Sequence, residues 1–160
     1  MSLETELESQ SFVLLRMGER RFALHAGDVG EMVTPGRIHR FPHETAGVDG
    51  VLLRRGRVVP VCEIAQKLTG ARLPARRFYL IAARRYGPAK EWVALPVSAE
   101  CELVAAEMAP QSGGDHPPHV AGWLSHDGEM IEVLNLEQLT PGPSGEGPAR
   151  PAQALEETRP

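Results

Sequence analysis

The sequence is short of several features that mark particular protein classes. Cysteine occurs only at Cys62 and Cys101, without C-x-x-C spacing, which favours two reduced, buried thiols over a disulfide or a metal site. Aromatic residues make up only 5% of the 160 residues, so few rings are available to stack on bases. No apolar run approaches the roughly 20 residues of a membrane span, and the first eight residues do not resemble a signal peptide. We therefore expect a cytoplasmic chain without direct membrane insertion.

Motifs of common enzymes and metal sites are absent as well. The sequence has no G-x-S-x-G elbow, no P-loop and no G-x-G-x-x-G run. Its six histidines include no H-E-x-x-H pattern, and the nearby carboxylates have no ordered ligand spacing. We expect no catalytic residues, no cofactor and no metal, so the protein is predicted not to be an enzyme.

What the sequence does contain is an internal repeat. Residues 50–64 read GVLLRRGRVVPVCEI and residues 122–136 read GWLSHDGEMIEVLNL, with both glycines of the first copy recurring 72 residues later. Two copies are too few for an open solenoid. The repeat therefore predicts a closed, pseudo-symmetric pair of half-repeats, at about 12–70 and 77–140.

Each half-repeat has the same predicted order of elements. It begins with a β-hairpin, continues into one or two helical turns (28–33 and 98–104), and adds two strands and a short closing helix. About five short strands per half predict a mostly β fold with short helices, built as two small barrels. Residues 1–11 are expected to be flexible. The segment 141–160 is rich in Gly, Pro, Ser, Glu and Ala without periodicity, so we expect a disordered tail.

Residues 50–64, preceded by 22–24 and 31–33, resemble the CheW-like family of bacterial chemotaxis coupling proteins. In that family the equivalent of 50–64 reads roughly G-x-x-N-L-R-G-x-x-x-P-x-x-D-L. The similarity runs from about residue 12 to 139. It implies two five-stranded SH3-like β-barrels packed with pseudo-two-fold symmetry. It also implies a non-enzymatic adaptor that links the signalling tip of methyl-accepting chemoreceptors to the regulatory domain of a chemotaxis histidine kinase.

The resemblance implies a partner-binding site as well. The family carries its receptor contact in the groove between the barrels and uses the arginine of its Asn-Leu-Arg-Gly turn, which is Arg55 here. Such an arginine presents a planar fork of donors to carboxylates or carbonyls on a partner helix. The candidate partner-binding residues are Arg55, Gly56, Arg54, Glu31, Val29, Met32, Ile38 and Leu52. Burial in the core is the commoner role for the four apolar residues of this set, and Glu31 could be a solvated helix residue.

The turn departs from the family pattern in ways that bear on its partners. Leu53 and Arg54 stand where the family has Asn and Leu, and Glu63 stands where it has Asp. Leu53 removes an amide that could cap the turn, and Arg54 exchanges an apolar contact for a charge. We hypothesise that one of the two usual contacts is lost or redirected. The protein would then bind receptor without recruiting kinase, or would serve a specialised pathway.

The arginine-rich turn also leaves a second interpretation open. Arg54, Arg55 and Arg57, with the arginine pairs 76–77 and 84–85, could form the basic groove of a small β-barrel that binds nucleic acid. The formal net charge of −4 and the scarcity of aromatic residues weigh against it. Paired arginines at strand ends commonly protect sheet edges from aggregation. We therefore expect no nucleic-acid partner.

Overall fold

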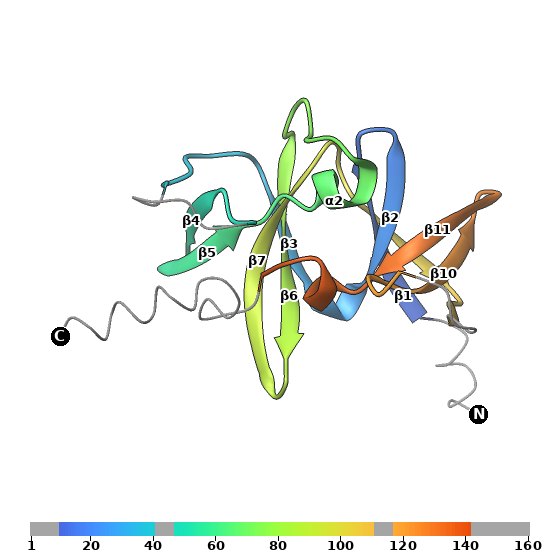
Figure 1. The fold of residues 1–160 in the computed structure, drawn as a ribbon. Helices are drawn as coiled ribbons and strands as arrows, with labels where there is room; N and C mark the ends of the chain where they lie inside the picture. Colours follow the sequence, from blue (N-terminus) through green and yellow to red (C-terminus); the bar gives the residue numbers. More distant parts are fainter. Residues whose placement is uncertain (1–9, 41–46, 111–116, 142–160) are drawn as a thin grey trace.

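Two curled β-sheets form the framework of the protein (Figure 1). The computed structural model describes residues 10–40, 47–110 and 117–141. Its strands are β1 (Gln10–Met17), β2 (Arg20–His25), β3 (Val29–Val33), β4 (Gly50–Arg54), β5 (Arg57–Val61), β6 (Phe78–Tyr86), β7 (Ala89–Val97), β8 (Glu102–Ala106), β9 (Ala109–Pro110), β10 (Val120–His126) and β11 (Glu129–Leu134). Its short helices are η1 (Ala26–Asp28), α2 (Ala65–Thr69) and η2 (Leu136–Gln138).

The two sheets have equivalent topologies and each curls into a half-barrel, which confirms the predicted mostly β fold of two pseudo-symmetric barrel units. One sheet has the strand order β3-β6-β7-β5-β4, and we call it the β4–β5 half-barrel. The other has the order β8-β1-β2-β11-β10-β9, and we call it the β10–β11 half-barrel. The antiparallel pair β3–β6 corresponds to β8–β1, and the parallel pair β5–β7 corresponds to β11–β2. Each half-barrel thus combines the opening hairpin of one sequence repeat with later strands of the other.

The helical turns predicted at 28–33 and 98–104 are wrong, because these segments contain strands β3 and β8. Only residues Ala26–Asp28 form a 3-10 turn before β3. The strand β3 pairs with β6, and β8 pairs with β1. Each of these partners lies in the other sequence repeat, so pairing over a long sequence distance overrides the local capping signal.

The two predicted terminal segments fall largely outside the described residues. Of these segments, residues 1–9 and 142–160 lie beyond the described part, whereas β1 already begins at Gln10. The predicted closing helices are present as α2 and η2. The helix α2 ends at Gly70, whose φ of 89° is the left-handed conformation that favours glycine at a helix end. In the described ranges, no helix has the length and apolar character needed to cross a membrane.

Among the residues that the structure describes, three apolar clusters hold the sheets together. The largest lies between them and includes Leu15, Leu24, Leu80 and Leu95. The other two fill the interiors of the two half-barrels. A central strand is therefore buried on both faces, which explains the nearly continuous apolar runs in β1, β6 and β7.

The hairpins β4–β5 and β10–β11 turn in the same way. At the first turn Arg55 and Gly56 have φ values of 53° and 76°, and at the second turn Asp127 and Gly128 have 51° and 77°. Two consecutive residues with positive φ define a type I′ turn, whose twist suits a β-hairpin. The second glycine of each sequence repeat is thus required by the turn that follows the strand.

Candidate partner-binding site

An ion pair between Arg54 and Glu31 joins the two edge strands of the β4–β5 half-barrel. The Nε and Nη2 atoms of Arg54 lie 3.2 and 2.9 Å from the two carboxylate oxygens of Glu31. This two-point contact fixes β4 against β3, the strand at the opposite edge of the same sheet. The hydrogen bond from Arg54 holds the pKa of Glu31 below its ordinary value. The charge of Arg54, which stands where the family pattern has Leu, is therefore neutralised within the chain by Glu31.

Arg55 lies at the tip of the same hairpin and is far less constrained. Its side chain is 74% exposed, and its Nη2 atom is 3.4 Å from an oxygen of Glu31 that also accepts from Arg54. This long, shared contact leaves most of the donors of Arg55 directed to solvent. The guanidinium is thus available to a partner while the turn itself is fixed.

A shallow pocket of about 420 Å³ lies beside this ion pair. Its wall is apolar and aromatic, whereas its rim carries the charged side chains of β3 and the β4–β5 turn. A Cβ atom at Gly30 would lie only 3.1 Å from the ring of Trp92, so glycine lets the indole pack against β3. The lining residues are Gly30, Glu31, Arg54, Arg55, Arg57, Val59, Ile81 and Trp92. Such a pocket can accept an apolar side chain beside an acidic group.

The structure brings together only part of the predicted site. Arg54, Arg55 and Glu31 meet at the pocket, with Gly56 in the adjoining turn. The apolar residues lie elsewhere, in positions set by the packing of the sheets. Leu52 is buried inside the β4–β5 half-barrel, Ile38 packs partly buried against it, and Val29 and Met32 pack against the central core.

Several lining residues of the pocket were not among the predicted site residues. Arg57 and Val59 could have been found, because alternation along β5 places them on the face of the hairpin that carries Arg54. Trp92 had no such signal. It reaches the pocket from β7, which belongs to the other sequence repeat and enters this sheet only through long-range pairing.

The outer face of the β4–β5 hairpin is unusually apolar for a strand near a sheet edge. Leu53 and Val58 are cross-strand partners and are 60% and 62% exposed. Leu53 occupies the position at which the family pattern has Asn. The two departures from the family pattern therefore have different structural effects. Leu53 forms an exposed apolar pair with Val58 on one face of the hairpin, whereas Arg54 forms an ion pair with Glu31 on the other face.

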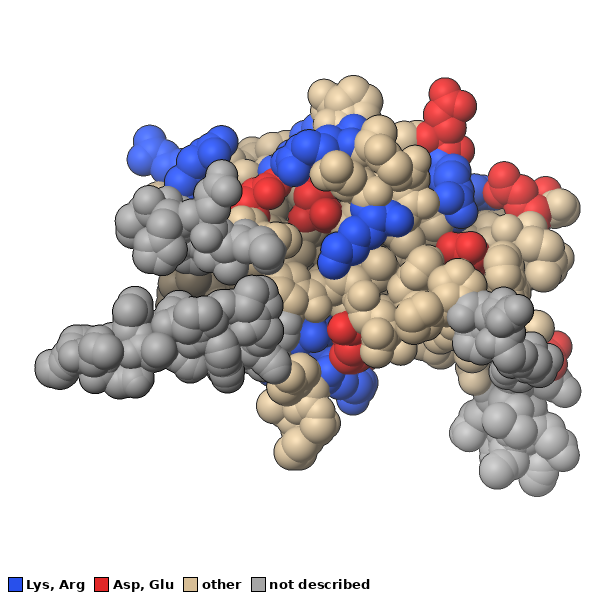
Figure 2. Space-filling view, viewed as in Figure 1, with Lys and Arg blue, Asp and Glu red and all other residues tan. Residues whose placement is uncertain are grey.

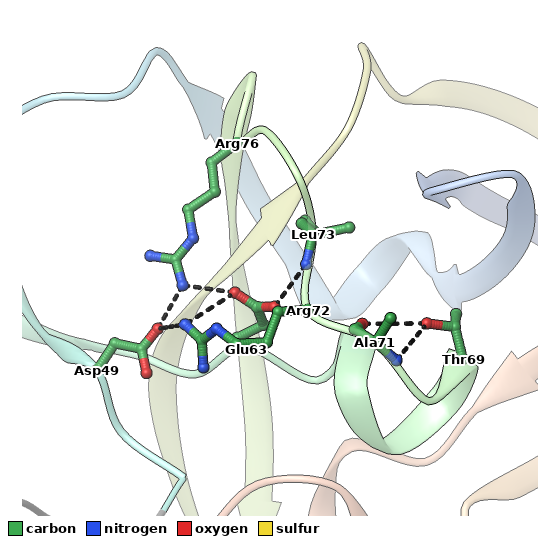
Figure 3. Close-up of polar contacts among 7 residues, drawn as sticks. All are labelled: Asp49, Glu63, Thr69, Ala71, Arg72, Leu73 and Arg76. Atoms are coloured by element: carbon green, nitrogen blue, oxygen red, sulfur yellow. Dashed lines mark hydrogen bonds and ion pairs between the residues drawn. The ribbon is translucent and has the colours of Figure 1, made fainter.

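A second polar cluster, separate from the pocket, fixes the loop between α2 and β6 (Figure 3). Glu63 is only 3% exposed and accepts a hydrogen bond from the backbone N–H of Leu73 at 2.8 Å. Arg72 and Arg76 each form ion pairs with both Glu63 and Asp49. Two buried or half-buried carboxylates are thus matched by two guanidinium groups, as expected of a structural cluster.

This cluster predicts a specific loss of stability in acid. Burial opposes ionisation of Asp49, but hydrogen bonds from Arg76 and Arg72 outweigh it and lower the pKa of Asp49 from its ordinary 3.8. The stabilisation is therefore present above that value and is lost as the pH falls through the lowered pKa. Asp49→Asn should reduce the difference between urea midpoints at pH 7 and pH 3. Glu19→Gln, in an exposed turn, is the control, and an equal reduction there would contradict the assignment.

The remaining chemical groups do not extend the site. Burial raises the pKa of the Cys62 thiol to about 12 and that of Cys101 to about 11, so both are protonated at neutral pH. Among the described residues, no three His, Cys, Asp or Glu side chains are grouped closely enough to hold a metal ion.

The arginine pairs considered for nucleic-acid binding are mostly engaged within the protein. Arg76 belongs to the polar cluster, and Arg85 pairs with Asp28 at 2.8 Å. Arg84 is buried and donates to the hydroxyl of Thr140 at 2.6 Å. On the face drawn in Figure 2, Lys and Arg are interspersed with Asp and Glu rather than joined into one basic stripe. The described surface offers little support for a polyanion groove.

The fold and the site together define a class: a module of two paired β-half-barrels with a charged, apolar-walled pocket beside one hairpin. The family model of the CheW-like domain matches residues 11–144, and the chain belongs to the CheW-like domain family. Among solved structures, the scaffolding protein TtCheW from Thermoanaerobacter tengcongensis has the same fold. It is 21% identical with a TM-score of 0.65, and the match covers 79% of this chain and 88% of that chain. No curated protein matches the sequence.

Proposed function

We propose that the chain is a non-enzymatic adaptor of bacterial chemosensory signalling. It binds the cytoplasmic signalling tip of a methyl-accepting chemoreceptor and either links it to the regulatory domain of a histidine kinase or modulates that coupling, and it works in the cytoplasm at receptor clusters. Membership of the CheW-like family supports the adaptor class in general. The observation that carries the receptor contact is the exposed, largely unpaired guanidinium of Arg55 beside an apolar pocket.

The pocket suggests how a receptor helix is held. An acidic side chain of the helix accepts hydrogen bonds from Arg55, whose planar fork suits a carboxylate. An apolar neighbour on the helix packs against Trp92 and Ile81. Arg54 remains paired with Glu31 and supports the turn. Affinity then comes from apolar burial, whereas Arg55 provides orientation and specificity.

Arg55→Asn tests this receptor contact. Asparagine tolerates positive φ, so the turn is retained while the guanidinium is lost. We expect binding of a receptor-tip hairpin fragment to weaken about 10- to 100-fold, because hydrogen bonds to charged groups contribute roughly 1.5–3 kcal/mol. The thermal midpoint should hardly change. Titration calorimetry and thermal unfolding measure the two effects.

Asp127→Asn is the matched control for this variant. Asp127 has the same backbone conformation in the equivalent turn of the β10–β11 half-barrel. It should leave receptor binding unchanged. Equal weakening by both variants, or a large drop in the midpoint of Arg55→Asn alone, would make the role of Arg55 structural instead.

The kinase contact is tested separately. The exposed Leu53 and Val58 pair supports an altered surface at the hairpin, and hence our proposal that one usual contact is lost or redirected. The protein is titrated with a receptor-tip hairpin and with a kinase regulatory domain from the same bacterium. Binding to both indicates an ordinary coupling protein, and binding to the receptor alone indicates a specialised adaptor. Binding to neither, with binding of single-stranded RNA at low salt, would replace the adaptor function with the nucleic-acid alternative.

A further inference from the structure

The pocket beside the β4–β5 turn carries more positive than negative charge. Three arginines line it, and Glu31 is the one carboxylate among its described lining residues. The two oxygens of Glu31 already accept from Arg54. Arg55 has only its long contact to Glu31, and Arg57 is exposed and forms no ion pair within the described ranges. Because the wall behind these charges is apolar and includes Trp92, the pocket fits a ligand that combines an apolar side chain with carboxylates.

The last described residues of the chain lie close to the strand that carries this pocket. The hydroxyl of Thr140 accepts a hydrogen bond at 2.6 Å from Nε of the buried Arg84, which fixes the chain at this point. The ring of the next residue, Pro141, lies beside Gly47, where a Cβ atom would be only 3.3 Å from it. Gly47 shortly precedes β4, and the other end of β4 carries Arg54. The chain therefore leaves the described part near the β4–β5 hairpin.

The sequence beyond this point contains a ligand of the required chemistry. Leu155 is the only large apolar residue in the range 142–160, and Glu156 and Glu157 follow it directly. We call these three residues the Leu-Glu-Glu segment. The match to the family model ends at residue 144, so the segment belongs to a part of the chain that the family pattern does not cover.

The spacing between Pro141 and Leu155 suits the distance to the pocket. Gly47 and Arg54 are seven residues apart, so at most about 25 Å separates them. Leu155 follows Pro141 by 14 residues, which can span about 50 Å when extended. A Gly-rich chain of this length has a root-mean-square end-to-end distance of roughly 20 Å. Tethering is most effective when this distance matches the span, and it then gives an effective concentration on the order of 1 mM.

We propose that the Leu-Glu-Glu segment occupies the pocket of its own chain and competes there with the receptor. Leu155 packs against Trp92, and the two carboxylates pair with Arg55 and Arg57. These are the two kinds of contact that a receptor helix makes in the proposed function, on which the competition rests. A receptor can bind only the fraction of molecules whose pocket is open, so its apparent affinity falls by that fraction. The segment thus acts as an autoinhibitory contact.

Proton NMR of the full chain tests the docking without any partner. Trp92 and Trp123 are the only tryptophans, so two indole N–H signals are expected, and Trp123→Phe assigns them. Docking predicts nuclear Overhauser contacts between the methyl groups of Leu155 and the ring of Trp92. Leu155→Ala should shift the Trp92 signal and leave that of Trp123, which lies in the other half-barrel, unchanged. Absence of these contacts together with an unshifted Trp92 signal overturns the proposal.

Removing the carboxylates tests the ion pairs. Glu156→Gln with Glu157→Gln should shift the Trp92 signal in the same direction as loss of the leucine, because docking is weakened in both cases. Glu146→Gln with Glu19→Gln is the control, since it removes the same charge outside the segment, and the Trp92 signal should stay in place. An equal shift in the control overturns the proposal.

Dilution distinguishes docking within one chain from docking between chains. The Trp92 signal should be independent of protein concentration, because a tethered segment has a fixed effective concentration. A signal that changes with concentration assigns the pocket to the segment of a second copy and overturns the contact within one chain.

Titration with a receptor-tip hairpin fragment measures the competition. The variant Glu156→Gln with Glu157→Gln should bind the fragment about 3- to 10-fold more tightly than the unmodified chain, because a competitor at roughly millimolar effective concentration is weakened. The control pair Glu146→Gln with Glu19→Gln should bind like the unmodified chain. Equal affinities for all three overturn the competition. If none of the three binds the fragment while the NMR contacts are present, the proposed receptor function fails and the contact within the chain stands.

Discussion

Replacing Gly50 with alanine is expected to lower the free energy of unfolding by about 2–3 kcal/mol, near the upper end of typical overpacking costs. A Cβ atom there would lie 2.6 Å from Cγ2 of Ile38 and 2.8 Å from the backbone oxygen of His39. The backbone of His39 cannot move freely, because it exchanges two hydrogen bonds with Val51 at 2.9 Å. The φ of 158° at Gly50 adds strain for any other residue.

Thermal and urea unfolding measure this effect. A loss of this size should lower the thermal midpoint by roughly 5–10 °C in a chain of this length. Gly36→Ala is the control, because a Cβ at Gly36 meets nothing within 4 Å. Equal thermal midpoints for Gly50→Ala and Gly36→Ala would contradict the prediction, because the loop before β4 would then move aside without loss of stability. Gly122 has the equivalent close contact, with the backbone oxygen of Ala109 at 2.7 Å, so its substitution should destabilise as well.

These glycines explain why the pseudo-symmetric fold could be predicted from the sequence. The first glycine of each repeat allows a neighbouring segment to cross the strand closely, and the second occupies the type I′ turn. Both requirements depend on the backbone and not on solvent-exposed side chains. The repeated spacing therefore reports a repeated backbone path, and it correctly indicated a pseudo-symmetric pair.

The exchange of hairpins between the repeats could not be predicted in the same way. Each opening hairpin is apolar on both faces, so its pattern does not say which later strands it joins. The strands β3 and β8 are short, and they mix residues that favour a helix, such as Glu31 and Ala105, with residues that favour a strand, such as Val33, so neither segment has a clear local preference. Their extended form comes from pairing with the other repeat.

The site was predictable only where the local turn defines it. The exposure of Arg55 follows from its place at the tip of a tight hairpin, and the resemblance already drew attention to it. Its neighbour Glu31 proved to be a paired strand residue and not a solvated helix residue. The wall formed by Trp92 and Ile81 depends on the tertiary fold, and sequence reasoning did not contain it.

The second large effect is expected from Glu63→Ala. This substitution should lower the free energy of unfolding by about 3 kcal/mol, the lower end of the cost of breaking a buried ion pair. The substitution removes the acceptor of the Leu73 N–H and one of the two carboxylates that face Arg76. Arg76 is largely buried, so water compensates its lost partner only in part. Urea unfolding at neutral pH measures the loss.

Glu129→Ala provides the matched control for burial. Glu129 also pairs with an arginine, at 2.7 Å, but is 55% exposed, so its loss should cost no more than about 1 kcal/mol. A double-mutant cycle of Glu63→Ala with Arg76→Ala separates the pair from its surroundings. If the double variant is more stable than the sum of the single losses predicts, the cost of Glu63→Ala lies in the guanidinium left without its partner. Strict additivity would show instead that the cost does not depend on Arg76, and it would favour the lost acceptor of the Leu73 N–H as its source.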